Sequence, residues 1–325
     1  MNIVILGCGG IGCYFGARLL QARHQVTFIG RGDHLAAIKK HGLKVDHPDF
    51  SFNQGVDAVS IDQWVSEFDP EIVDVVLLSV KAMVTTEVAE LCARWINSSR
   101  KKPFFVSLQN GVDNEINLVK NLGEDKVIGG LTRRIGANIE LPGMISATGP
   151  AETIIGFWPN SDHLDNSDSV NDSDRGKVFV TKLQAVFNEA GIPTEQSEDI
   201  RLQLWKKLVI NNGVNALAAL LQKKTGAILK DKALADLVMK MMQETAIAAK
   251  CDDVILSSED IQEMYDLICT FDSIKPSMLI DRERGRPLEI NEICGAVIER
   301  SEKLGVDAPY TRSISTLLQF EIDQK

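Results

Sequence analysis

Apolar runs of strand length alternate with longer amphipathic stretches over the first part of the chain. Five runs are rich in apolar, β-branched or aromatic residues, as expected of parallel strands in a buried sheet; they span 2–6, 24–31, 74–82, 104–111 and 126–131. Apolar residues recur with helical spacing in stretches between these runs, at 11–22, 83–96 and 112–122. This alternation of strand and helix predicts a doubly wound parallel sheet.

The pattern changes after residue 132. Turn-forming pairs at Pro142-Gly143 and Gly149-Pro150 divide the next stretch into short extended pieces, which predict an antiparallel addition to the sheet. Residues 158–176 are rich in Asp, Ser and Asn, so we expect a solvated, mobile loop that lacks the ligand spacing of an EF-hand. Residues 176–198 then predict one more helix and strand of the same domain.

From residue 200 to the end, the apolar positions follow a helical period. Long amphipathic segments span 200–221, 231–250, 258–270 and 289–304. We therefore predict an α/β protein in which a Rossmann-type doubly wound domain, residues 1–198, precedes an all-α helical domain, residues 199–325.

The charge and hydropathy of the chain restrict its partners. It has 325 residues and a formal net charge of -10 at pH 7, whereas a nucleic-acid surface needs an excess of basic residues. No apolar run approaches the roughly 20 residues of a membrane span. The N-terminal run is broken by glycines and has no basic region of a signal peptide before it. We expect a cytoplasmic monomer or homodimer that binds neither nucleic acid nor membrane.

The cysteine spacing predicts neither disulfides nor a metal site. The 6 cysteines include no CxxC pair. We interpret them as reduced thiols that pack as small hydrophobic residues; they are Cys8, Cys13, Cys92, Cys251, Cys269 and Cys294.

The first strand leads directly into G-C-G-G-I-G, a GxGxxG pattern made by Gly7, Gly9 and Gly12. Such a pattern alone also occurs in turns that bind nothing, but here a strand precedes it, a helix follows it, and the unit has the βαβ length of about 30 residues. The glycines suit a tight turn, a close approach of a pyrophosphate and close helix packing, respectively. With Cys8, Gly10 and Ile11, whose backbone lies at the helix start, they predict a dinucleotide site.

The second strand ends at Arg31, which distinguishes between the two nicotinamide dinucleotides. NAD-binding folds place an acidic residue about 20 residues beyond the glycines, where it accepts bonds from the ribose. A guanidinium instead suits the 2′-phosphate of NADP. The alternatives are a solvated surface arginine and an influence of Asp33, two residues further on. The pattern favours NADPH.

Polar residues follow two further strands. Lys81 comes after the strand at 74–82, and Asn110 comes after the strand at 104–111. Because ligands of open α/β sheets bind outside the carboxyl ends of the strands, these residues predict one site with the glycine turn. Asn110 precedes a glycine, so a turn is its structural alternative.

The predicted helix 200–221 carries a polar stripe in an apolar setting. Lys207, Asn211 and Asn215 are spaced i, i+4, i+8 and so share one face. Buried asparagines are costly without partners, which a ligand or a structural network could supply. Lys206 is the competing lysine, but its own stripe is apolar, so we favour Lys207 as the functional one.

The chain resembles the ketopantoate reductase (2-dehydropantoate 2-reductase) family over nearly its whole length. The resemblance rests on the motifs GCGGIG, SVKA, LQNG, LWKKLVINNGVNALAA and SMLIDRERGRPLEINEICGAVIERSEKLGVDAP. The last two are long, and no generic nucleotide-binding fold requires them.

The resemblance implies NADPH-dependent reduction of 2-dehydropantoate to (R)-pantoate in pantothenate and coenzyme A biosynthesis. It matches residues of this chain to roles as follows: Lys207 to the general acid, Glu289 to the carboxylate that bonds the substrate hydroxyl beside the cofactor, Asn211 and Asn215 to substrate-contacting asparagines, Ser277 to a serine near the substrate carboxylate, Lys81 and Asn110 to residues at the nicotinamide and substrate, and Arg31 to the residue at the 2′-phosphate. Two positions depart from the pattern: Val84 stands where many members have Gln, and Ile274 where some have Asn. Both departures concern substrate identity.

These residues suit reduction of a 2-keto acid. Hydride transfer leaves an alkoxide, which a nearby ammonium group stabilises and protonates. Glu289 has an alternative role as a carboxylate at a helix N-terminus, and Ser277 has one as an N-cap after Pro276. We interpret Arg282–Arg286 as a solvated connection between helices. The alternative functions are reduction of another 2-keto acid and a non-catalytic NADP-binding sensor, which would need only the first domain.

Overall fold

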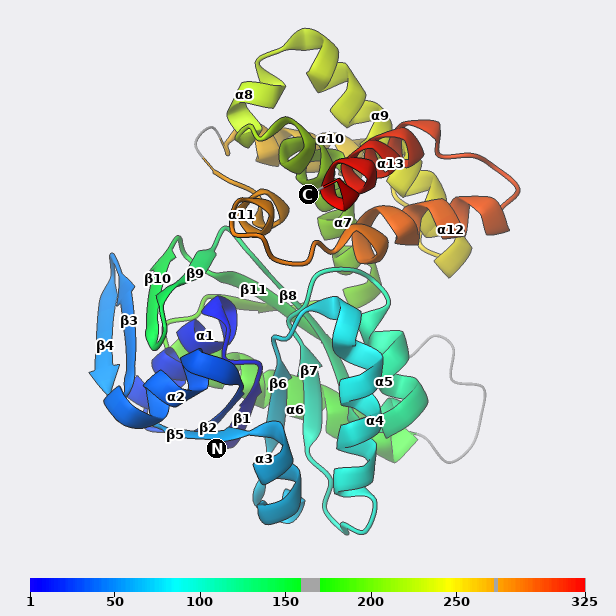
Figure 1. The fold of residues 1–325 in the computed structure, drawn as a ribbon. Coiled ribbons are helices and arrows are strands. Elements are labelled where there is room, and N and C mark those ends of the chain that lie inside the picture. Colours follow the sequence, from blue (N-terminus) through cyan, green and yellow to red (C-terminus); the bar gives the residue numbers. More distant parts are fainter. Residues whose placement is uncertain (159–169, 272–273, 325) are drawn as a thin grey trace. The chain divides into compact units, whose positions relative to one another are not determined.

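The computed structural model describes residues 1–158, 170–271 and 274–324, with the side chains of 170–174 left aside. The contacts between residues divide this chain into two compact units (Figure 1). The first unit comprises Met1–Gln109 and Asn114–Ile200, and the second comprises Asn110–Asp113 and Arg201–Lys325. In the described chain, no helix has the length and apolar character that crossing a membrane requires.

The first unit is built on a sheet whose eight strands, within the described residues, lie in the order β12-β11-β8-β7-β6-β1-β2-β5. β11 runs antiparallel to β8, and the other pairings in this sheet are parallel. The bounds are Asn2–Leu6 (β1), Gln25–Gly30 (β2), Asp57–Ser60 (β5), Val75–Leu78 (β6), Phe104–Ser107 (β7), Val127–Arg133 (β8), Glu152–Phe157 (β11) and Thr194–Gln196 (β12). The predicted doubly wound sheet is therefore confirmed.

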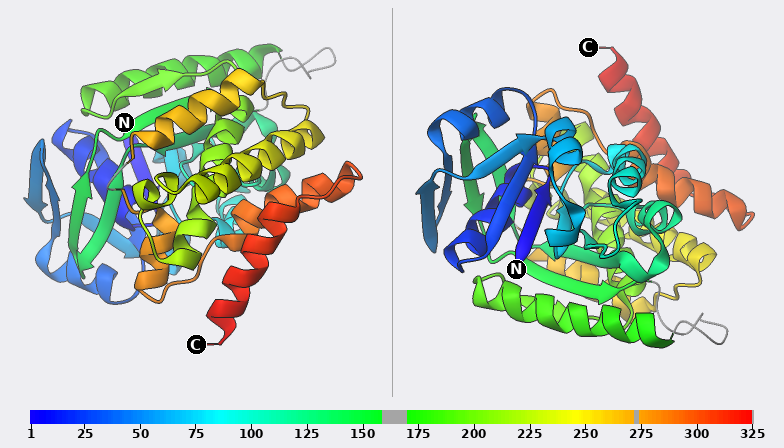
Figure 2. Two further views of the ribbon diagram at one scale, coloured as in Figure 1. Left: turned by 90° about the horizontal axis from the view of Figure 1, so that it is seen from above. Right: turned by 90° about the horizontal axis from the view of Figure 1, so that it is seen from below.

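The connections of this sheet reverse direction between β1 and β6. From β1 the chain moves outward through β2 to β5, whereas from β6 it moves the other way through β7 to β8. The helices of the unit are Gly10–Gln21 (α1), Gly32–His41 (α2), Ile61–Glu67 (α3), Thr85–Ile96 (α4), Asn114–Leu122 (α5) and Val170–Glu189 (α6). The views in Figure 2 show α6, in green, across the sheet from the cyan helices α4 and α5. Ligands of doubly wound folds bind at such a reversal, outside the carboxyl ends of the two strands.

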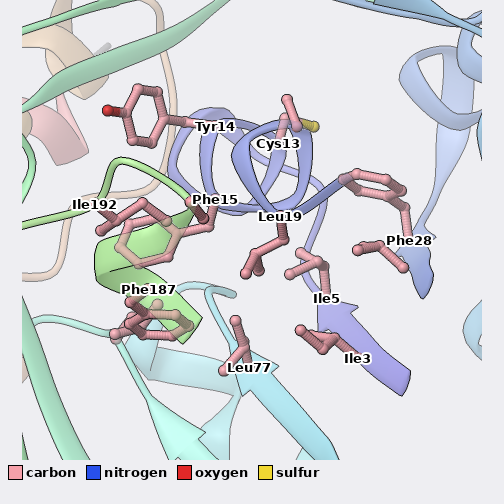
Figure 3. Packing of buried hydrophobic residues seen from close by; sticks show 14 of the residues in the cluster. Ile3, Ile5, Cys13, Tyr14, Phe15, Leu19, Phe28, Leu77, Phe187 and Ile192 are labelled. Carbon is pink, nitrogen blue, oxygen red and sulfur yellow. The ribbon is translucent and has the colours of Figure 1, made fainter. Parts of the chain in front are cut away.

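The core of the first unit lies between the sheet and helices α1 and α6 (Figure 3). Alternate residues of the central strands, such as Ile3, Ile5 and Leu77, point to this face. They meet Phe15 of α1 and Phe187 of α6, whose rings lie edge to face with centroids 5.6 Å apart. Because α1 is buried along most of its length, it is held firmly on the strand that precedes it.

A second, four-stranded sheet in the order β4-β3-β10-β9 packs on the outer side of α1. Its strands are Leu43–His47 (β3), Phe50–Gln54 (β4), Gly136–Leu141 (β9) and Met144–Thr148 (β10). The sequence predicted extended pieces at 137–157 as an antiparallel addition to the main sheet, but β9 and β10 belong to this separate sheet, and only β11 joins the main one. β3, β4 and β5 were not predicted.

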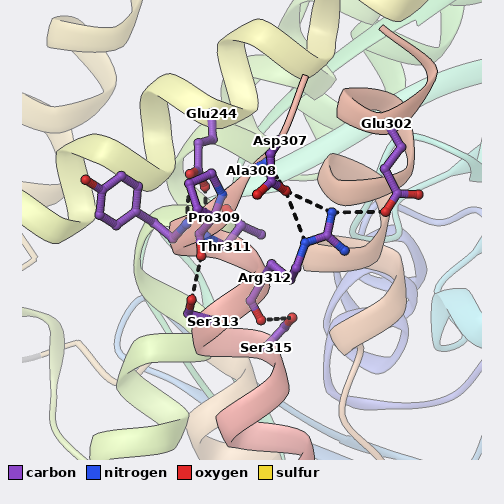
Figure 4. A network of polar contacts seen from close by, with 10 residues as sticks. Glu244, Glu302, Asp307, Ala308, Pro309, Thr311, Arg312, Ser313 and Ser315 are labelled. Atoms are coloured by element: carbon purple, nitrogen blue, oxygen red, sulfur yellow. Dashed lines mark hydrogen bonds and ion pairs between the residues drawn. The ribbon is translucent and has the colours of Figure 1, made fainter. Parts of the chain in front are cut away.

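In the described part of the second unit, all regular secondary structure is helical. Its helices are Ile200–Leu221 (α7), whose first residue belongs to the first unit, Thr225–Leu229 (α8), Lys232–Ala249 (α9), Ser258–Cys269 (α10), Ser277–Glu283 (α11), Ala296–Lys303 (α12) and Pro309–Asp323 (α13). The Glu244 carboxylate of α9 accepts the backbone N–H groups of Tyr310 and Thr311, at 2.9 and 2.8 Å (Figure 4). A carboxylate stabilises the N-terminus of α13 in this position.

Three predictions about local structure were wrong or incomplete. Residues 170–176 begin α6 instead of continuing the predicted loop, and 159–169, the rest of that loop except Trp158, lie outside the described residues. Cys269 is exposed, and Cys251 is half-buried, so these two thiols are not packed in the core. The predicted helix at 289–304 contains a π-helical turn at Asn291–Gly295.

Candidate active site

The glycine turn lies at the end of β1, where the connections of the sheet reverse. Gly7 has a φ of +114°, and a Cβ there would lie 2.7 Å from the backbone nitrogen of Val80. A Cβ on Gly12 would collide with the Gly7 carbonyl oxygen and with Ser79 Oγ, so α1 packs against the turn only because residue 12 has no side chain. These contacts account for the first and third glycines of the pattern.

Gly9 differs from these two glycines because a Cβ there would meet no heavy atom of the described chain within 4 Å. The Gly9 carbonyl accepts the N–H of Cys13 at 2.9 Å, so the preceding amides of α1 lie at its open N-terminus. The N–H of Cys8 is instead bonded to the Ile29 carbonyl, at 3.0 Å. A dinucleotide pyrophosphate fits this arrangement, which offers free space over Gly9 and N–H donors from Gly10 to Gly12.

Gly10 has a structural role that the sequence analysis missed. A Cβ at this position would collide with the backbone of Ala137 in β9. The second sheet therefore approaches the N-terminus of α1 so closely that only glycine fits. No local sequence signal indicated this, because β9 is far away in the chain.

Arg31 is exposed and forms the N-cap of α2 directly after β2. Its side chain thus starts from the carboxyl end of the strand next to β1, as the sequence predicted. Asp33 lies in the first turn of α2, where a carboxylate interacts favourably with the helix dipole. This dipole interaction gives Asp33 a local structural role.

Lys81 and Asn110 follow neighbouring strands but belong to different units. Lys81 is half-buried and caps a 3-10 turn, Ala82–Val84, three residues after β6. Asn110 follows β7 but makes its contacts in the second unit, where its Nδ2 donates to Glu289 Oε2 at 3.2 Å. The structure therefore brings Asn110 and Glu289 together, although they are far apart in the sequence.

The two lysines of α7 have different surroundings. Lys206 Nζ forms ion pairs with Asp260, at 2.7 Å, and with Glu263, at 2.9 Å. Burial alone would lower the pKa of Lys206, but these two carboxylates outweigh it and raise the pKa. Lys206 is thus tied to α10, whereas Lys207 lies on the stripe of Asn211 and Asn215. The ion pairs with Asp260 and Glu263 give Lys206 a structural role.

The asparagines of α7 also differ from one another. Asn215 is only 4% exposed, and no hydrogen bond is recorded for its side chain, or for that of half-buried Asn211, within the described residues. Asn212 is fully buried, and its Nδ2 lies 2.9 Å from the hydroxyl oxygens of both Thr245 and Thr311. Asn212 lies off the i, i+4 stripe, so the sequence pattern did not indicate it.

Asn212→Ala should lower the free energy of unfolding by about 1–3 kcal/mol, because it removes a buried amide that joins α7 to α9 and α13. Urea denaturation measures the change. Asn211→Ala is the matched control, and its effect should stay within about 0.5 kcal/mol. Equal losses in the two variants would show that Asn212 has no special structural role.

The segment from Ser277 to Glu289 contains both exposed and buried candidates. Ser277 is the exposed first residue of α11, whose N-cap is Pro276, so the alternative role of Ser277 as an N-cap was wrong. Glu289 is 5% exposed and directly precedes a helical turn, and its carbonyl accepts the N–H of Ile293. The Glu289 carboxylate thus binds Asn110, and Glu289 also lies at the start of a helix, as its structural alternative requires.

The interpretation of Arg282–Arg286 as a solvated connection was wrong at Arg282. The side chain of Arg282 is 6% exposed, and its Nη1 donates to the carbonyls of Ala219, at 2.5 Å, and Leu220, at 3.0 Å. These carbonyls end α7 and have no later N–H in the helix to bond to, so the guanidinium caps the helix.

Comparison with known proteins identifies relatives along the whole chain. The family described as ketopantoate reductase PanE/ApbA matches residues 3–160, and its C-terminal domain matches residues 199–321. The 2-dehydropantoate 2-reductase of Pyrococcus abyssi is 31% identical over 310 residues, which cover 95% of this chain and 94% of that protein. The protein of the same name from Pyrococcus horikoshii is 30% identical over 316 residues, covering 95% and 93%.

Solved structures share the fold of this chain. A PanE/ApbA family ketopantoate reductase from Ralstonia eutropha JMP134 has a TM-score of 0.83 and 27% identity, covering 100% of this chain and 99% of that one. A D-mandelate dehydrogenase solved with NADH and anilino(oxo)acetate has a TM-score of 0.86 and 24% identity, with the same coverage. The second likeness concerns the fold alone.

Proposed function

Because the chain belongs to the ketopantoate reductase family, we propose that it reduces 2-dehydropantoate to (R)-pantoate with NADPH, in the cytoplasm, for pantothenate and coenzyme A biosynthesis. In this proposal residues 1–198 bind the dinucleotide. Residues 199–325 bind the keto acid and supply the proton. The relatives support a reductase, and the residues below support the finer assignment.

The observation that carries the proposal is the polar stripe of α7. Asn215 is buried, and the described structure records no hydrogen bond for its side chain. An amide that bonds to no group of the described chain, in a largely apolar helix, favours a ligand as its partner. Lys207, two turns earlier on the same face, brings a cation to that ligand.

Each residue has a role in this chemistry. NADPH, when bound, supplies the hydride that converts the keto group into an alkoxide. Lys207 holds its proton next to the keto oxygen, stabilises the charge that develops there and donates the proton. Glu289 accepts a hydrogen bond from the substrate hydroxyl and from Asn110, which fixes the carboxylate. Ser277 and Asn211 add donors to the substrate.

The residues assigned to NADPH lie in the first unit, apart from Asn110 and Glu289. The turn Gly7–Gly12, including Cys8 and Ile11, takes the pyrophosphate, and Arg31 takes the 2′-phosphate as a bidentate cation. Lys81, after β6, lies at the reversal of the sheet connections, where the nicotinamide end is expected.

Gly9→Ala should leave the melting temperature within about 1 °C of the wild type, because nothing of the described chain opposes a methyl group at this position. The same methyl group would occupy the space assigned to the pyrophosphate, so the Kd for NADPH should rise at least about tenfold. Fluorescence titration measures the Kd. In Gly12→Ala, by contrast, the melting temperature should fall by several degrees, on the order of 1 kcal/mol or more of lost stability. An unchanged Kd for NADPH in Gly9→Ala would contradict the assignment of the pyrophosphate to this turn.

A spectrophotometric assay of NADPH oxidation with 2-dehydropantoate tests the proposed function. We expect turnover that depends on the keto acid and stays low with NADH. Binding of NADPH without turnover on any 2-keto acid would contradict it and favour an NADP-binding sensor.

The departures at two positions favour a second candidate, reduction of a more apolar 2-keto acid. Ile274 is 42% exposed and Val84 is half-buried. The family resemblance implies Gln in many members at position 84 and Asn in some at position 274. The discriminating substrate is 3,3-dimethyl-2-oxobutanoate, which lacks the hydroxyl group of 2-dehydropantoate. A higher kcat/KM for this analogue than for 2-dehydropantoate would favour the second candidate. It would also contradict the role assigned to Glu289, which is to bind the substrate hydroxyl.

A further inference from the structure

Four residues, Asn110–Asp113, belong to the second unit although the chain on both sides belongs to the first. The residues that flank this segment are held in the first unit by one threonine. Gln109 Nε2 donates to Thr85 Oγ1 at 2.7 Å, and Thr85 Oγ1 donates to Asn114 Oδ1 at 2.8 Å. All three residues are buried, so the two ends of the segment are fixed.

The segment itself is bonded to the second unit at both of its ends. At its start, Asn110 Nδ2 donates to Glu289 Oε2 at 3.2 Å. At its end, the Asp113 carboxylate accepts two hydrogen bonds from the guanidinium of Arg300. Arg300 Nη2 lies 2.6 Å from Asp113 Oδ1, and Nη1 lies 3.4 Å from Asp113 Oδ2. The paired geometry suits a guanidinium and not an ammonium group.

Arg300 is in turn fixed from other sides. Its side chain is 6% exposed, its Nε donates to Asp252 Oδ2 at 2.7 Å, and its guanidinium carbon lies 5.4 Å from the centre of the Trp205 ring in α7. Burial alone would lower the pKa of Arg300, but the two carboxylates outweigh it and raise the pKa. The cation therefore stays charged, and it joins α12 to Asp113 and to the helix that carries Lys207.

Ile290–Lys303 forms one continuous helical run. Glu289 directly precedes this run, and Arg300 lies within it. Eleven residues of helix span about 16 Å. The segment Asn110–Asp113 is bonded to Glu289 and Arg300 at its two ends, and the long arginine side chain contributes to the reach between them; the π-helical turn Asn291–Gly295 lies between these two residues in the sequence. π turns of this kind are frequent at functional sites.

We propose that Arg300 is a positioning residue: by binding Asp113 it holds the segment Asn110–Asp113 so that the Asn110 amide meets Glu289. This inference rests on the proposed function only for the consequence in catalysis, because the placement itself is a property of the free protein. Arg300 does not touch substrate or cofactor in this proposal. It acts through Asn110.

The placement is tested by hydrogen–deuterium exchange of the full-length protein without ligand. In Arg300→Met, amide exchange in peptides covering 110–113 should accelerate at least about tenfold, since the bond to Asp113 is lost. Arg312→Met is the matched control, because Arg312 also pairs with two carboxylates, Glu302 and Asp307, but at 41% exposure. Unchanged exchange at 110–113 in Arg300→Met would overturn the proposal whatever the protein reduces.

The catalytic consequence is tested by kinetics at a temperature where all variants are folded. Arg300→Met should lower kcat for 2-dehydropantoate about 10- to 100-fold, as a small misplacement of an active-site group does. Arg300→Lys should recover only part of this loss. Asp113→Asn should match Arg300→Met, and the double variant should be no worse than either single one.

Asn110→Ala separates this proposal from the proposed function. If Asn110→Ala lowers kcat but Arg300→Met does not, the positioning role is overturned while the assignment of Asn110 stands. If Asn110→Ala leaves kcat unchanged, the assignment of Asn110 fails, and with it the consequence proposed for Arg300. A loss of kcat in both variants, absent in Arg312→Met, supports both.

Discussion

Replacing Lys207 with methionine should lower kcat for 2-dehydropantoate by about 10²- to 10⁴-fold, the range in which a general acid contributes to catalysis. Methionine has a similar length but carries no proton and no charge, so the alkoxide that follows hydride transfer loses its proton donor and its cation. The Kd for NADPH should change less than about threefold, because the residues assigned to its phosphates lie elsewhere. Stopped-flow measurement of NADPH oxidation, with a separate titration of NADPH, checks both values.

Lys206→Met is the control, because it removes the neighbouring ammonium group, which is bound to Asp260 and Glu263. It should cost on the order of 1 kcal/mol of stability and leave kcat within about twofold. If the two variants exchanged these effects, Lys206 would be the acid and the stripe argument would be wrong. If neither lost turnover, the proton would come from another group.

Arg31→Ala should raise the Kd for NADPH about 10- to 50-fold and change the Kd for NADH less than about twofold. The guanidinium is proposed to bind the 2′-phosphate, which is the group that NADH lacks. Because the side chain is exposed, the effect on NADPH should shrink as the salt concentration rises. Fluorescence titration of both dinucleotides at two salt concentrations measures the change.

Arg94→Ala, which removes an exposed arginine from α4, is the control for a change in overall charge. It should leave both dissociation constants unaltered. Equal weakening of NADPH and NADH in Arg31→Ala would contradict a role at the 2′-phosphate and would leave the choice of dinucleotide to other residues.

The sequence was sufficient to predict the central strands of the main sheet, but not its edge strand β5, because the central strands are buried on both faces. Such strands are apolar along their whole length, as Val75–Leu78 is, and glycines or polar residues mark their ends. The short strands β3 and β4 carry charged or polar residues among apolar ones and bury only part of their side chains, so their pattern is weak. Pairing of β10 with β3 joins residues about 100 positions apart, which no local pattern reveals.

The candidate site was predictable where spacing along one element defines it. Lys207, Asn211 and Asn215 follow from the helical period, and Arg31 follows from its place at a strand end. The bond between Asn110 and Glu289, and the binding of Asp113 by Arg300, depend on how distant segments fold together. Arg300 stands in a charged stretch of the sequence that resembles a solvated helix surface, so only its burial distinguishes it.

The division of the chain has a consequence for how the two units can be exchanged between proteins. The backbone passes between the units at residues 109–110, 113–114 and 200–201, so no single cut separates them. A fragment ending at Ile200 would retain the eight-stranded sheet but would carry Asn110–Asp113 without Glu289 and Arg300. A chimaera that takes its helical unit from a relative must therefore take these four residues from the same relative.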